Sequence, residues 1–175
     1  MVVIKKNTGI GILAQLFAAL VLVACIKEEP MVLDKEYPEF IVFGQYANPD
    51  NCFGNADNCV NIFRIDPMGL NEDADSNFPE SGIPLAANFS ENRSSSAYEN
   101  VQQLFLDNPP PQALLDMASG TVGTAPEWAT NFYFEYKTPS GYKYWIIDGS
   151  FDGSLPGEIQ SYVNTIQQAI NLSFQ

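Results

Sequence analysis

Residues 131–148 of this 175-residue chain carry its strongest folding signal, a β-hairpin. Two runs rich in aromatic and β-branched residues, 131–137 (NFYFEYK) and 142–148 (YKYWIID), have the composition of strands. The linker between them, 138–141 (TPSG), has proline and glycine where a type I turn favours them. We therefore expect the core to be built on an antiparallel sheet.

A second hairpin is expected between residues 39 and 65. The runs 39–46 (EFIVFGQY) and 59–65 (CVNIFRI) are again β-prone, and the segment that separates them is rich in Asn, Asp, Gly and Pro. Residues 66–95 and 121–130 have few apolar positions in any regular pattern, so we expect both segments to be mostly loop.

Helices are expected in three places. Ser96 is a candidate N-cap with Glu99 three residues later, a capping-box spacing, and Pro109 ends that helix. Residues 112–118 predict a short second helix, and 158–172 predict a longer amphipathic one. The sum is an α+β fold, a four-stranded antiparallel sheet of two hairpins with helices packed on one face.

The N-terminal segment has the features of a bacterial secretory signal. Lys5 and Lys6 precede an apolar run over residues 10–24. The run is short for a permanent membrane span, which needs about 20 apolar residues. We therefore expect this segment to direct export.

The end of that run, residues 22–25 (LVAC), resembles the lipobox of bacterial lipoproteins. The resemblance implies cleavage before Cys25 and lipid attachment to its thiol. The chain then divides into a signal peptide (1–24), a lipidated tether (25–37) and one α+β domain (38–175). An ordinary secretory signal with an incidental cysteine is the alternative.

The residues after Cys25 add a second signal. Lys27, Glu28 and Glu29 resemble the surface-export signal of Bacteroidota lipoproteins, and no aspartate follows Cys25 to signal retention at the inner membrane. The resemblance implies an outer-membrane lipoprotein exposed at the cell surface. The periplasmic face is the alternative location, with the charged residues serving only as a solvated tether.

The body of the chain resembles a group of uncharacterised small lipoproteins of Bacteroidota. The resemblance rests on residues 43–46 (FGQY), the pair Cys52 and Cys59, residues 60–65 (VNIFRI) and residues 142–148 (YKYWIID). No activity is attached to this group, so the resemblance implies no catalytic residue.

Charge narrows the classes of partner. Loss of the signal with its two lysines leaves six basic residues against 21 acidic ones, a net charge of −15. Such a chain repels nucleic-acid phosphates, so nucleic acid is excluded as a partner. The membrane is then a partner only through the lipid anchor. The acidic residues are scattered, which is the pattern of a solubilising surface.

Cys52 and Cys59 are expected to form a disulfide, because an even pair this close in an oxidising compartment is typical of one. Closing so short a loop contributes about 2.5 kcal/mol in the chain-entropy model. A zinc site is the rival interpretation, but the chain contains no histidine to complete four nitrogen or sulfur ligands.

The candidate chemistry is sparse. The absence of histidine excludes a Ser-His-Asp triad, and no glycine-rich phosphate loop is present. We therefore assign no catalytic residue, metal ligand or cofactor. Acidic loops leave calcium binding open, through Glu72, Asp73 and Asp75 or through Asp50 and Asp57, although a solvated loop is the better interpretation of them.

The aromatic residues of the second hairpin suggest a binding face. Tyr133, Tyr142, Tyr144 and Trp145 would stack on sugars or contact a partner wherever the sheet is not covered by helix, with core packing as the alternative. Alternation places Tyr133 on the face opposite Phe132. We predict a non-catalytic binding module for an unknown protein or glycan, with the Cys52–Cys59 loop beside it. The alternatives are an inhibitor of a protease or lysozyme and a carboxylate-dependent glycan hydrolase.

Overall fold

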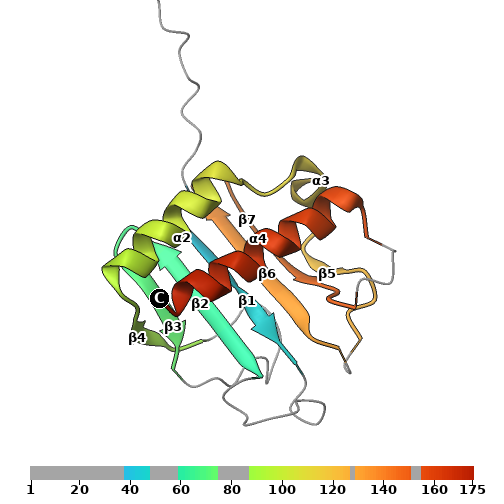
Figure 1. Cartoon of the computed structure of the whole chain (residues 1–175). Coiled ribbons are helices and arrows are strands. Elements are labelled where there is room, and N and C mark those ends of the chain that lie inside the picture. The colour runs from blue at the N-terminus through green and yellow to red at the C-terminus, as the bar shows by residue number, and fades with distance from the viewer. Residues whose placement is uncertain (1–37, 48–58, 75–86, 127–128, 151–154) are drawn as a thin grey trace, which may run out of the picture. The chain divides into compact units, whose positions relative to one another are not determined.

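The computed structural model describes residues 38–47, 59–74, 87–126, 129–150 and 155–175 (Figure 1). They form one seven-stranded sheet in the order β4-β3-β2-β1-β6-β7-β5, together with three helices. The strands are β1 Phe40–Tyr46, β2 Val60–Asp66, β3 Gly69–Asp73, β4 Phe89–Asn92, β5 Gly120–Val122, β6 Asn131–Thr138 and β7 Gly141–Ile147, and the helices are α2 Ser95–Asp107, α3 Gln112–Leu115 and α4 Gly157–Ser173. The α+β class is confirmed, whereas the expected four-stranded sheet is wrong.

Both expected strand pairs are present and antiparallel. Tyr46 of β1 lies opposite Val60 of β2, and Thr138 of β6 lies opposite Gly141 of β7 across a two-residue connection. Strands β1 and β6 also pair with each other in antiparallel fashion. The two hairpins therefore join through their first strands at the centre of one sheet.

Three strands lie in segments expected to be loop. Strands β3 and β4 extend the sheet beyond β2, and β5 pairs in parallel with the end of β7. All three are short, and β3 (GLNED) and β4 (FSEN) are polar, so neither has the composition of a strand. Backbone hydrogen bonds to the neighbouring strands outweigh that weak propensity. In addition, Glu72 of β3 forms an ion pair with Arg93.

The helices all lie on one face of the sheet (Figure 1). Helix α2 turns Ala97, Val101 and Phe105 inward, and α4 buries an apolar stripe that includes Ile159 and Ile166. The spacing of four residues in α2 and of seven in α4 puts these side chains on one helical face. The main core therefore lies between the helices and one side of the sheet.

Helix α2 begins two residues earlier than the sequence suggested. The hydroxyl of Ser94 accepts a hydrogen bond from the Ala97 N–H at 3.0 Å, so Ser94 is the N-cap. The expected cap at Ser96 with its box to Glu99 is therefore wrong. Any of the three successive serines 94–96 could act as a cap. A cap at Ser94 contributes about 1 kcal/mol and leaves Ala97 of the first turn buried in the core.

Candidate functional site

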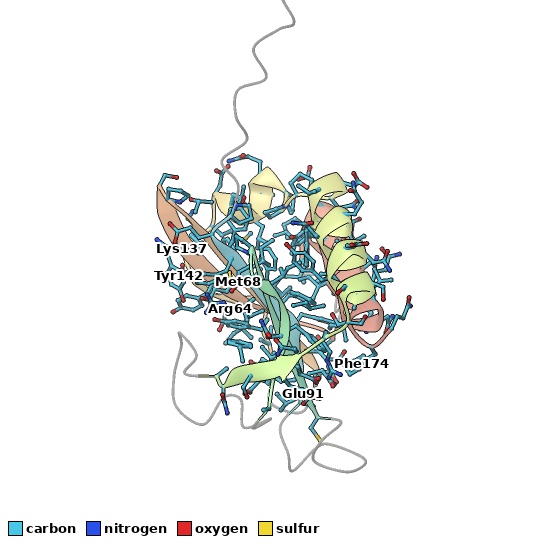
Figure 2. All side chains as sticks on the ribbon, turned by 90° about the vertical axis from the view of Figure 1, so that its left-hand side faces the viewer. Arg64, Met68, Glu91, Lys137, Tyr142 and Phe174 are labelled. Carbon is cyan, nitrogen blue, oxygen red and sulfur yellow. The ribbon has the colours of Figure 1, made fainter. Side chains whose placement is uncertain are left out.

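The face of the sheet away from the helices carries a mixed aromatic and polar surface. Strand alternation brings side chains from four neighbouring strands to this face, which Figure 2 shows for Arg64, Lys137 and Tyr142. We define the aromatic–polar patch as six residues: Phe40, Arg64, Glu135, Lys137, Tyr142 and Tyr144. No described helix covers it (Figure 1).

Cross-strand register arranges the patch in two rows. Val42 of β1 lies opposite both Arg64 and Glu135, and Glu135 lies opposite Tyr144, so one row crosses four strands. Three strand spacings make this row roughly 14 Å long. In the next row Lys137 lies between Phe40 and Tyr142.

Gly44 holds β1 and β2 close beneath the patch. A Cβ atom at this position would lie 2.1 Å from the carbonyl oxygen of Asn61 and 2.7 Å from the Ile62 side chain. Ile62 occupies the space over the glycine and is fully buried on the patch side of the sheet. This close approach explains why an otherwise β-branched and aromatic strand contains a glycine.

Glu135 is the centre of the patch and is only 6% exposed. Its carboxyl group accepts a hydrogen bond from the Tyr133 hydroxyl at 2.7 Å and another from the Tyr142 hydroxyl. Burial raises the pKa of Glu135, and these two bonds and the charge of Arg64 offset the rise only in part. Glu135 therefore keeps its proton to a higher pH than a surface glutamate.

Arg64 is held in position by two contacts. Its guanidinium lies 4.5 Å from the centre of the Phe40 ring, and its Nε atom lies 3.1 Å from Asp66 Oδ2. The side chain is still 38% exposed. Arg64 is therefore an oriented hydrogen-bond donor that a ligand can reach.

Two tyrosines of β7 form the other end of the patch. The ring centres of Tyr142 and Tyr144 lie 6.3 Å apart at an interplanar angle of 49°. Tyr142 is 37% exposed and Tyr144 is half-buried. Burial raises the pKa of Tyr142 above its ordinary value, and the charge of Glu135 adds to this, so the phenol stays protonated.

The structure separates the four aromatic residues that the sequence had grouped. Tyr142 and Tyr144 lie in the patch, and Tyr133 lies on the same face but is fully buried beneath it. Trp145 points to the helix side, where it is fully buried with its ring centre 6.0 Å from that of Phe134. Including Trp145 in the binding face was wrong, because adjacent strand residues face opposite ways.

The sequence analysis missed four members of the patch: Phe40, Arg64, Glu135 and Lys137. Each follows the alternation of its own strand, so the face on which it lies could be predicted from the sequence. Their proximity could not be predicted, because it depends on the pairing of β1 with β6. That pairing joins segments about ninety residues apart.

The structure describes one of the two cysteines of the predicted disulfide. Cys59 is buried and disulfide-bonded, and its partner lies outside the described residues. Cys52 lies outside them too, as do Cys25, Lys27, Glu28 and Glu29. The pairing of Cys52 with Cys59 and the roles of the N-terminal residues therefore stay predictions.

The acidic segment considered for calcium begins as a strand. Glu72 and Asp73 belong to β3, where Glu72 pairs with Arg93 and Asp73 accepts a hydrogen bond from the Asn88 N–H at 3.0 Å. Asp50, Asp57 and Asp75 lie outside the described residues. Within the described ranges, no three Asp, Glu, Cys or His side chains gather to hold a metal ion. No helix in this part of the chain is long and apolar enough to cross a membrane.

Two carboxyl groups at the patch already have partners. Glycoside hydrolysis needs two carboxyl groups at a defined separation across the bond to be cleaved. Glu135 is hydrogen-bonded to two tyrosines, and Asp66, a second carboxyl group near the patch, is paired with Arg64.

No protein-family model, curated protein or solved structure matches this chain.

Proposed function

We propose that this chain is a lipid-anchored protein of the outer membrane, exposed at the cell surface, whose aromatic–polar patch binds a ligand without changing it covalently. One observation carries the binding role: partly exposed Tyr142 and Arg64 are held in fixed positions on either side of buried Glu135. Side chains that are already ordered lose less entropy when a ligand binds. The patch is therefore prepared for contact.

The anchor rests on the sequence. Cys25 at the end of the apolar run would carry the acyl chains, each buried CH₂ of which contributes roughly 0.8 kcal/mol. Lys27, Glu28 and Glu29 would direct the protein to the cell surface. A surface position would give the patch access to ligands outside the cell.

Changing Lys27, Glu28 and Glu29 together to alanine is expected to move the protein from the cell surface to the periplasmic face. Protease treatment of intact cells, followed by an antibody to the domain, should digest the wild type and spare this variant. A Cys25→Ala variant is the control for the anchor and should lose palmitate labelling. Protection of the wild type until the outer membrane is broken would contradict surface exposure.

A photo-crosslinking amino acid at position 142 is expected to capture the ligand in living cells, because Tyr142 is the most exposed ring of the patch. The matched control is position 106, since Leu106 of α2 is 42% exposed on the opposite layer. An adduct from position 142 and none from position 106 is the expected result on a gel. Equal adducts from both positions, or none from position 142, would contradict a binding role for this face.

A further inference from the structure

Basic and acidic side chains around the patch are equal in number. Arg64 and Lys137 are basic, and Glu135 and Asp66 are acidic, in a chain whose net charge is −13. A polyanion would be repelled by the chain as a whole and would find no excess of basic side chains here. A basic partner would be attracted more strongly to other surfaces. This balance favours a ligand without net charge.

The polar groups around the patch include both hydrogen-bond donors and hydrogen-bond acceptors. The guanidinium of Arg64 and the ammonium of Lys137 only donate, and the carboxylate of Asp66 only accepts. The hydroxyl of Tyr144 does both. A ligand that matches such a surface must itself carry groups that both donate and accept. Hydroxyl groups have that property, so a polyhydroxylated ligand fits.

Flat apolar surface completes the pattern. Tyr142 is 37% exposed, and Tyr144 is partly exposed. The apolar faces of sugar rings pack against aromatic rings of this kind. The longer row of the patch extends roughly 14 Å across four strands, which is more than one small molecule needs. We infer that the ligand of the aromatic–polar patch is an uncharged carbohydrate chain, an inference that rests on the proposed binding function.

Affinity electrophoresis of the full chain in detergent tests this inference. The gels would contain a neutral α-glucan, β-glucan, mannan or xylan, or the polyanion polygalacturonate. At least one neutral polysaccharide is expected to retard the wild type, and Tyr142→Ala and Tyr144→Ala should each weaken the binding about tenfold. Leu106→Ala removes a similarly exposed apolar side chain from α2 and should bind as the wild type does. Circular dichroism would verify that each variant is folded.

Other results overturn the inference in distinguishable ways. Retardation by polygalacturonate alone would show that charge selects the ligand. Retardation by a neutral polysaccharide that Tyr142→Ala and Tyr144→Ala leave unchanged would place the carbohydrate site elsewhere. If no polysaccharide binds while crosslinking from position 142 captures a polypeptide, the carbohydrate inference is wrong and the binding function stands. If neither experiment finds a ligand, both are wrong.

Discussion

Replacing Trp145 with alanine is expected to lower the free energy of unfolding by about 4 kcal/mol. Trp145 is the largest fully buried side chain of the described core. It lies between Phe134 on β6 and Gly120 on β5, under the helices. Sheet neighbours on both sides limit the collapse of the cavity, so most of the lost packing energy stays lost.

Trp145→Phe is the matched control. The indole N–H of Trp145 has no hydrogen-bond partner within the part of the chain that the structure describes. Phenylalanine removes this donor and keeps most of the ring, so a loss of only about 1 kcal/mol is expected. Urea unfolding followed by circular dichroism would compare the two variants. Equal losses would mean that Trp145 does not pack in the core as described.

Trp145 also illustrates what the sequence can and cannot predict. Alternation along residues 131–137 correctly placed Phe132 and Tyr133 on opposite faces of the sheet. The same rule applied to 142–148 puts Trp145 on the face opposite Tyr142 and Tyr144, whereas aromatic composition alone grouped it with these tyrosines. Periodicity was therefore the better guide, because the two faces of a strand are fixed by backbone geometry.

The strands at the edges of the sheet could not be predicted from the sequence, for a different reason. Strands β3, β4 and β5 contain five, four and three residues, too few for a periodic pattern to emerge. Their pairing is decided by the strands already in place, with β5 held parallel to the end of β7. Tertiary context of this kind outweighs local propensity. The sequence predicted loops in these segments because their composition is rich in Asn, Asp and Ser.

Replacing Asp148 with asparagine is expected to lower the free energy of unfolding at neutral pH by about 3 kcal/mol, since hydrogen bonds to a charged group are strong. Asp148 is buried at the end of β7 and accepts four hydrogen bonds. The Thr124 N–H donates at 3.0 Å and the Ser150 N–H at 2.7 Å, and both hydroxyl groups also donate. An asparagine NH₂ group would face donors in place of an acceptor.

The effect of Asp148 should depend on pH in a defined direction. Burial alone would raise the pKa of Asp148, but the hydrogen bonds from Ser150 and Thr124 more than offset it and hold the pKa well below its usual range. A carboxyl group with a lowered pKa in the folded state stabilises the fold above its unfolded pKa of about 3.9, and this contribution is lost as the pH falls below that value. The difference between wild type and Asp148→Asn should therefore be constant from pH 5 to 8 and shrink toward pH 3.

Asp116→Asn supplies the control for exchanging a carboxyl group for an amide, because Asp116 is exposed at the end of α3. Urea unfolding would be measured at pH 7 and pH 3, and at pH 7 this control variant should differ little from the wild type. A gap for Asp148→Asn that is equally large at pH 3 would mean that the variant only disturbs packing. A gap that narrows at pH 3 would show that the loop at Thr124 is fastened to β7 by the charge of Asp148. In that case acid would loosen the β5 edge of the sheet.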